Sequence, residues 1–218
     1  MPEKTTLFRL GFLLSMAAMA PGIHAAGPAA GLPAGLYAIF TTSRGMITAK
    51  LYEKYTPIAV ANFVGLATGT KAWRDPLTGA MVQRPMYDNI TFHRIIHDEM
   101  IQSGDPTGTS AHDCGIRIPD EFLPGLTFNR PGKLAVANTG APDSGGCQFF
   151  ITAGTVEHWD NQYTIFGEVV SGMPVVIAIN HGQLHGEKPV DPVRLIRVTI
   201  ERVGAPPRLK APKPGRKE

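Results

Sequence analysis

Cysteine is scarce in this chain, and neither sign of charge dominates it. The 218 residues include two cysteines, too few for a disulfide framework or a four-cysteine zinc site. The formal net charge is only +3, so we expect no nucleic-acid partner. The sequence has no internal repeat, which excludes propellers and solenoids.

Turn-forming residues, by contrast, are abundant. The 24 Gly and 19 Pro favour short strands joined by turns over a helical bundle. Hydrophobic residues make up 43% of the chain, an ordinary share for a folded protein and too high for a disordered one. We therefore expect one compact domain that buries a full core.

Residues 1–25 have the pattern of a secretory signal peptide. The positively charged Lys4 and Arg9 precede an apolar run over Leu10–Ala20, and the small residues Ala25 and Ala26 follow this run. The run is shorter than the roughly 20 apolar residues that span a bilayer, so we expect no stable membrane insertion after cleavage. A buried or amphipathic helix is the alternative, but the run lacks a polar face. The pattern predicts an exported protein, periplasmic in a bacterium or secreted.

Two low-complexity segments border the predicted domain. Residues 26–35 are rich in Gly, Pro and Ala, which is typical of a flexible linker. Residues 204–218 are rich in Pro, Lys and Arg with almost no apolar residues, which is typical of a flexible basic tail. The single domain is expected over residues 36–203.

The domain pattern is rich in strands and contains two helices. Thr56 as N-cap, Pro57 at the first helical position and Gly69 at the end predict one helix, and residues 173–180 predict a second. The first helix is apolar on nearly every side, so we expect it to be covered all round and to plug the end of a sheet or barrel. Strands are expected over residues 36–40, 46–52, 91–96, 100–103, 133–137, 148–152, 163–169 and 196–201. Short strands with two capping helices predict one closed antiparallel barrel.

Six short segments stand in order along the domain: Phe92–Ile96 (FHRII), Met100–Asp105 (MIQSGD), Ala137–Gly140 (ANTG), Gln148–Thr152 (QFFIT), Trp159–Tyr163 (WDNQY) and Phe166–Gly167. Together they closely resemble the cyclophilin family of peptidyl-prolyl cis-trans isomerases, and bacterial members are also similar through residues 73–88. The resemblance covers Leu36–Val203. It implies an all-β fold, a single closed eight-stranded antiparallel barrel capped by two helices. It also implies proline-containing polypeptides as substrates, and we expect a monomer without a cofactor.

The resemblance implies a role for each matching position. Arg94 would be the catalytic hydrogen-bond donor, Gln102 would orient the peptide backbone, and Met100, Phe150 and Trp159 would line a proline pocket. The full set of implied substrate contacts is His93, Glu99, Met100, Gln102, Ala137, Asn138, Thr139, Phe150, His158, Trp159 and Tyr163.

The residues themselves leave one alternative open. Arg94 lies on an apolar strand, where an arginine is either a structural ion-pair partner or a positioned donor. An arginine does not deprotonate in proteins, so it suits hydrogen bonding rather than proton transfer. Rotation about an X-Pro bond requires no nucleophile. It requires an apolar slot for the proline ring, hydrogen bonds that hold the flanking backbone, and a donor near the twisting amide nitrogen. Phe149, next to Phe150, is expected in the core because neighbours on a strand face opposite ways.

Two single positions and one loop depart from the family pattern. Glu99 stands where the family normally has a pocket Phe, so it removes apolar contact and could pair with Arg94. Ser103 replaces a usual Gly, and residues 112–114 replace part of a Gly-rich loop. We expect lowered isomerase activity or an altered substrate preference. The alternative is a cyclophilin-fold module that binds proline-containing segments, chaperone-like, with little turnover.

The two cysteines leave a disulfide open. Cys147 directly precedes Gln148, and the loop that carries Cys114 should approach it, so the pair could be bonded in an oxidising compartment or remain two thiols. His93, His97 and residues 112–114 contain metal-ligand types, but they form no ligand set at a standard spacing. We therefore expect no metal.

Overall fold

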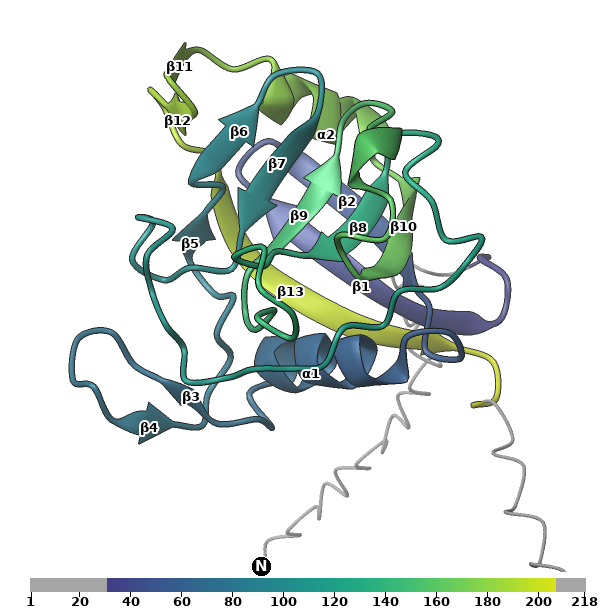
Figure 1. Ribbon diagram of the computed structural model, residues 1–218, viewed down its shortest axis with the longest axis horizontal. Helices are drawn as coiled ribbons and strands as arrows, with labels where there is room; N and C mark the ends of the chain where they lie inside the picture. Colours follow the sequence, from purple (N-terminus) through teal and green to yellow (C-terminus); the bar gives the residue numbers. More distant parts are fainter. Residues whose placement is uncertain (1–30, 207–218) are drawn as a thin grey trace, which may run out of the picture.

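One curled antiparallel sheet dominates the computed structural model, which describes residues 31–206 (Figure 1). Its elements, in chain order, are β1 (Gly35–Thr42), β2 (Gly45–Leu51), α1 (Pro57–Thr68), β3 (Trp73–Arg74), β4 (Met81–Val82), β5 (Ile90–Thr91), β6 (Arg94–Ile96), β7 (Met100–Ser103), β8 (Lys133–Val136), β9 (Phe149–Thr152), the 3-10 helix η1 (Glu157–Trp159), β10 (Ile165–Ser171), α2 (Met173–Asn180), β11 (Leu184–His185), β12 (Lys188–Pro189) and β13 (Arg194–Val203). The predicted signal peptide lies outside the described residues, as do residues 26–30 of the linker and 207–218 of the tail. Among the described residues, no helix is long and apolar enough to cross a membrane.

The sheet has nine strands and is open, where the sequence predicted a closed barrel of eight. Its order is β5-β13-β1-β2-β10-β8-β9-β7-β6, so β5 and β6 are its edges. The predicted strand over residues 91–96 is in fact these two edge strands. The Phe92 N–H bonds to the Val193 carbonyl next to β13, whereas the His93 N–H bonds to the Gln102 carbonyl on β7. The chain thus changes partner between Phe92 and His93, and the break leaves the sheet open.

The two helices cover opposite ends of the curled sheet (Figure 1). α2 has the predicted bounds, and α1 begins at Pro57 and ends before Gly69, whose φ of 75° is left-handed. Thr56 makes no side-chain cap, and instead the Glu121 carboxylate accepts the N–H groups of Ile58 and Ala59 at 3.1 and 2.8 Å. The prediction that α1 is covered all round is wrong, because Ile58 is 45% exposed.

Alternation along the strands divides the apolar residues between two faces. One face forms the main core, where the rings of Phe40, Phe63, Tyr87, Phe149 and Phe166 pack together. The other face carries a smaller cluster made of Met100, Phe128, Ala135, Phe150, Val156 and Ile165. Neighbouring residues on one strand therefore serve different clusters, as predicted for Phe149 and Phe150.

Glu168 on β10 is the centre of a network of ion pairs and hydrogen bonds. The Glu168 carboxylate accepts hydrogen bonds from the Tyr52 hydroxyl at 2.6 Å, from Arg130 at 2.7 and 2.8 Å, and from the buried Lys133 ammonium at 3.3 Å. Burial alone would raise the pKa of Glu168, but the bonds from Arg130, Tyr52 and Lys133 outweigh it and lower this pKa to about 2.

Candidate active site

A row of side chains across β6, β7 and β9 forms the base of the site. Arg94 pairs in register with Gln102, and Gln102 pairs with Phe150. Directly opposed residues on adjacent strands lie on the same face of a sheet, so these three side chains stand side by side. Met100 stands two residues before Gln102 on β7 and shares this face. Strand register thus brings the implied donor beside the implied pocket.

A hollow of about 280 Å³ opens over this row, and we name it the Arg94 pocket. Its floor is aromatic. The Phe150 ring packs edge-on against Trp159 and Tyr163, with ring centroids 5.4 and 5.2 Å apart, and stacks on Phe128 with centroids 5.9 Å apart. Such a floor offers the contact that an apolar ring requires. The residues that line the pocket are Arg94, Ile96, Glu99, Met100, Gln102, Ala137, Asn138, Phe150, Trp159 and Tyr163.

The Arg94 guanidinium is held at two of its nitrogens. Its Nε donates to Oε2 of Glu187 at 2.5 Å, and its Nη1 donates to Oε1 of Gln102 at 3.1 Å. The Gln102 amide in turn donates to Oε1 of Gln148 at 2.8 Å, and the Gln148 amide donates to the Ser110 carbonyl at 3.1 Å. This chain of hydrogen bonds fixes the orientation of the Gln102 amide and leaves other Arg94 N–H groups available to a ligand.

Asn138 lines the Arg94 pocket, and hydrogen bonds hold both its side chain and the backbone beside it. Its Nδ2 donates to the Gln162 carbonyl at 2.8 Å, and its Oδ1 accepts the Gly140 N–H at 3.0 Å. The N–H of the preceding Ala137 donates to the Gln148 carbonyl at 2.9 Å. Hydrogen bonds therefore hold the chain in place at both Ala137 and Asn138, which line the Arg94 pocket.

Glu99 lines the Arg94 pocket without contacting Arg94 in an ion pair. Its Oε1 lies 4.0 Å from Nε2 of His158, and its side chain is 33% exposed. The carboxylate partner of Arg94 is Glu187, so the pairing of Glu99 with Arg94 that the sequence left open does not occur in this structure. Glu99 is partly solvated at the rim, which spares it the full cost of burying a charge.

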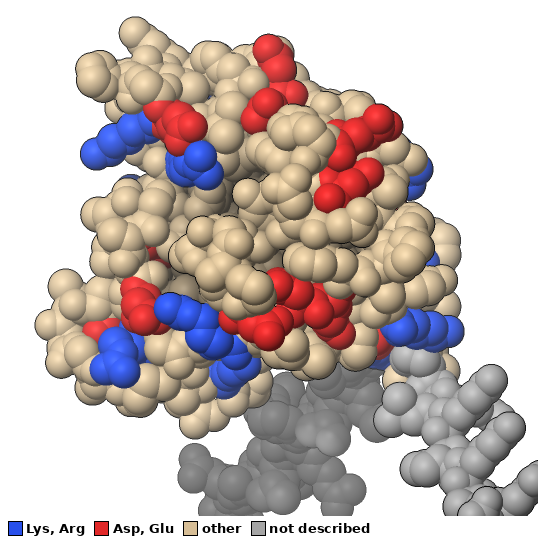
Figure 2. All heavy atoms as spheres, in the orientation of Figure 1, with Lys and Arg blue, Asp and Glu red and all other residues tan. Residues whose placement is uncertain are grey.

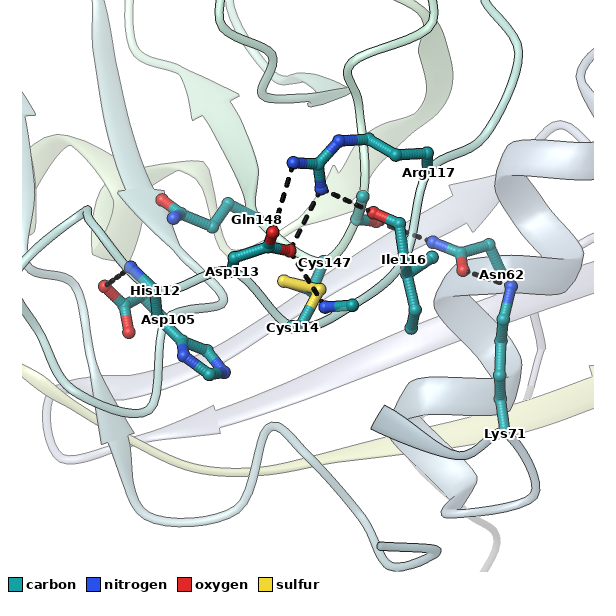
Figure 3. The surroundings of a disulfide bond; sticks show 12 residues. Asn62, Lys71, Asp105, His112, Asp113, Cys114, Ile116, Arg117, Cys147 and Gln148 are labelled. Atoms are coloured by element: carbon teal, nitrogen blue, oxygen red, sulfur yellow. Dashed lines mark hydrogen bonds and ion pairs between the residues drawn. A yellow bond between two sulfur atoms is a disulfide. The ribbon is translucent and has the colours of Figure 1, made fainter. Parts of the chain in front are cut away.

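A second hollow of about 310 Å³, the disulfide pocket, adjoins the first and shares Gln102, Ala137 and Asn138 with it. Figure 3 shows the Cys114–Cys147 disulfide, in which the two Cα atoms are 6.4 Å apart. In this structure the two cysteines are therefore bonded rather than free thiols. The other lining residues are Ser110, Ala111, His112, Asp113, Arg117, Thr139, Ser144, Gly146 and Gln148.

The loop that carries Cys114 is tied by carboxylates. Asp113 pairs with Arg117 at 3.1 Å, and hydrogen bonds from the Gly115 N–H and from Arg117 lower the pKa of Asp113. Burial alone would raise the pKa of Asp105, but hydrogen bonds from the amide and hydroxyl of Thr107 lower it. The rim of the disulfide pocket is thus polar, in contrast to the aromatic floor of the Arg94 pocket.

Of the residues that the resemblance implied, the structure brings ten to the linings of these two pockets or to the Arg94 row. His93 differs: it is 5% exposed and outside both linings, because it precedes Arg94 and faces the other way. Burial lowers the pKa of His93.

His158 is exposed at the rim beside Glu99. Among residues 31–206, no group of three or more His, Cys, Asp or Glu is placed to hold a metal ion.

Two contributors to the site were missed by the sequence analysis. Gln148 stands in the QFFIT segment, so a signal was present, but no role followed from it. Glu187 lies 93 residues from Arg94 in a Gly-containing stretch, and nothing local in the sequence marks it. On the face drawn in Figure 2, acidic and basic side chains lie in separate groups, some of one sign and some of both, between large uncharged areas.

Comparison with known proteins gives one consistent answer. The family model described as cyclophilin type peptidyl-prolyl cis-trans isomerase/CLD matches residues 37–200. The chain is 44% identical over 162 residues to peptidyl-prolyl cis-trans isomerase A of Mycobacterium tuberculosis, covering 73% of this chain and 88% of the relative. It is 40% identical over 170 residues to peptidyl-prolyl cis-trans isomerase B of Streptomyces anulatus, covering 76% and 97%.

A solved structure agrees with these relatives. A cyclophilin type peptidyl-prolyl cis-trans isomerase of Cryptosporidium parvum, crystallised in the presence of the dipeptide Ala-Pro, superposes with a TM-score of 0.65 at 27% identity. The match covers 77% of this chain and 99% of that one. The match to the family model, the identity to these relatives and the curled antiparallel sheet with two helices lead to one conclusion: the chain belongs to the cyclophilin family and is a peptidyl-prolyl cis-trans isomerase of that type.

Proposed function

We propose that this isomerase accelerates rotation about X-Pro bonds in exported proteins while they fold, with Arg94 as the donor to the twisting prolyl amide. The observation that carries the proposal is the position of the Arg94 guanidinium at the edge of an aromatic-floored pocket. The Cryptosporidium parvum relative was solved in the presence of Ala-Pro, which supports proline-containing peptides as the substrate class.

The proposed mechanism is non-covalent. Amide resonance gives the peptide bond a rotational barrier of about 18–20 kcal/mol. As the bond twists, resonance is lost and the prolyl nitrogen gains a lone pair. A hydrogen bond from Arg94 to this nitrogen forms only in the twisted state, so it lowers the barrier rather than strengthening substrate binding equally.

The other pocket residues hold the substrate. The pyrrolidine ring packs on Phe150, Met100 and Trp159, while Gln102 and Asn138 bind the flanking backbone. Fixing the chain on both sides of the twisting bond ensures that rotation, rather than rigid reorientation of the peptide, follows binding.

The export context rests on the pattern of residues 1–25, and a buried disulfide also suits an oxidising compartment. We propose a periplasmic or secreted mature protein whose substrates are newly exported chains. Expression of the full sequence in a bacterium tests this: the protein recovered from the periplasm or medium should begin near residue 26. An uncleaved chain confined to the cytoplasm would contradict the export proposal.

Glu99 favours a second candidate, a proline-peptide binding module with little turnover. Its carboxylate lines the pocket where apolar contact with the proline ring is needed, so the rate enhancement would be small. Gln102 and Asn138 would still bind the peptide backbone. Binding without rate enhancement would support this candidate over the enzyme.

The deciding experiment is a cis-to-trans isomerisation assay on short X-Pro peptides with the unmodified protein and Arg94→Ala. Arg44→Ala is a matched control, because Arg44 is half-exposed and pairs with Asp191 away from the pocket. We expect a rate well above background that falls by two or more orders of magnitude in Arg94→Ala only, in line with the loss of a transition-state donor. Background rates for all three proteins would contradict the enzymatic proposal.

A further inference from the structure

Glu187 contacts β6 through both its main chain and its side chain. It lies in the turn between β11 and β12, and its carbonyl accepts the Ile95 N–H at 2.8 Å. Its carboxylate accepts the Nε–H of Arg94, the residue before Ile95 on β6, at 2.5 Å. An exposed ion pair between two flexible side chains contributes little, but here the backbone contact fixes where the carboxylate stands.

The two bonds of the guanidinium constrain its plane from different sides. Arginine carries five N–H donors in a rigid planar fork. Glu187 occupies Nε and Gln102 occupies one N–H of Nη1, so the group cannot rotate freely about its own side chain. Glu187 is not part of the Arg94 pocket lining, so it acts on substrate only through Arg94.

A second carboxylate lies in the pocket that Arg94 lines. Glu99 lines the same pocket as Arg94, and its ion-pair contact, with His158 at 4.0 Å, is long. A guanidinium released from Glu187 would be free to pair with Glu99, the one carboxylate in the lining of this pocket, and such a pair would take the donor away from substrate.

We propose that Glu187 is a positioning residue of the isomerase: its carboxylate holds the Arg94 guanidinium toward the prolyl amide and away from Glu99. This inference rests on the proposed role of Arg94. It assigns the β11–β12 hairpin, remote in sequence from the pocket strands, a part in catalysis.

The test compares Glu187→Ala and Glu187→Gln with Asp191→Asn in the X-Pro isomerisation assay. Asp191 is a suitable control because it follows the same hairpin, is 92% exposed and lies 3.9 Å from Arg44. We expect Glu187→Ala to lower kcat about tenfold with KM nearly unchanged, since an oriented charge-assisted donor is lost. Glu187→Gln keeps an acceptor for Nε and should retain more activity, and Asp191→Asn should match the unmodified protein. A loss in Asp191→Asn equal to that in Glu187→Ala would overturn the inference, because any lost carboxylate in this region would then have the same effect.

Double variants separate positioning from a merely structural role. In the Arg94→Ala background, Glu187→Ala should cause no further loss, and a further tenfold loss would overturn the inference. Glu99→Gln should restore part of the activity of Glu187→Ala, because it removes the competing carboxylate. If Arg94→Ala abolishes activity while both Glu187 variants keep full rates, the inference alone fails. If Arg94→Ala keeps full activity, the proposed function of Arg94 fails instead.

Discussion

Reduction of the Cys114–Cys147 disulfide should destabilise the protein by an amount that its loop length sets. The bond joins residues 33 apart in the sequence, and both cysteines are nearly fully buried. Closing a loop of that size removes chain entropy from the unfolded state worth about 3.7 kcal/mol at 25 °C. For a domain of this size, the same loss lowers the melting temperature by roughly 7–15 °C.

The assay is denaturant unfolding of the oxidised and reduced protein, followed by tryptophan fluorescence. Trp73 is fully buried in the main core, so its emission should report global unfolding. The slope of the free energy of unfolding against denaturant should also rise on reduction, because an uncrosslinked chain exposes more surface. Cys114→Ala/Cys147→Ala checks the result without reductant, since alanine adds no buried polar group.

A thiol count on the unreduced, denatured protein serves as the control, and it should find no free thiol. A reduced protein that loses less than about 1 kcal/mol would refute the loop-closure argument, since the formula gives several times more. Two free thiols in the unreduced protein would refute the bond itself.

Three further predictions follow from contacts described above. Glu99→Phe should raise kcat/KM for X-Pro peptides severalfold, because it replaces a pocket carboxylate with apolar surface, and an unchanged rate would show that Glu99 does not limit the pocket. The Glu168 carboxylate has its pKa lowered to about 2 in the folded protein, so its contribution to stability is complete above about pH 4.3 and is lost as the pH falls toward 2. Melting temperatures across this range should therefore fall less steeply in Glu168→Gln, and curves of equal slope would contradict the assigned pKa. Glu121→Ala should lower the free energy of unfolding by about 1 kcal/mol, as for a lost helix cap, and a denaturation midpoint equal to that of the unmodified protein would show that the Ile58 and Ala59 N–H groups do not need the carboxylate.

Strand alternation made part of the site predictable. Once Arg94, Gln102 and Phe150 are on strands, period-two alternation decides which of their neighbours face the pocket, and Phe149 enters the core for the same reason. The helix over residues 173–180 was predicted with the bounds that the structure shows, and Pro174 stands in its first turn, where proline is tolerated.

Features that depend on tertiary contact could not be predicted in this way. The break in the strand over residues 91–96 arises because Phe92 and His93 bond to different neighbours, and the residues of this short segment carry no sign of such a change. Ile58 is exposed although α1 is apolar, since a helix at the end of a sheet is covered on one side only. Glu187 meets Arg94 only because a separate hairpin docks on β6, which no local pattern encodes.

The pairing of the first strand with the last has a consequence for how the molecule forms. β13 lies between β1 and β5, and its register with β1 runs from Gly35 opposite Val203 to Thr42 opposite Leu195. While the ribosome still holds the C-terminal strand, β1 therefore lacks one of its two neighbours. Contacts between residues so distant in sequence also slow folding, because the long loop must close before they form. The sheet can be completed only after the whole domain has been released, and a chain truncated before residue 194 should remain in a state that proteases degrade.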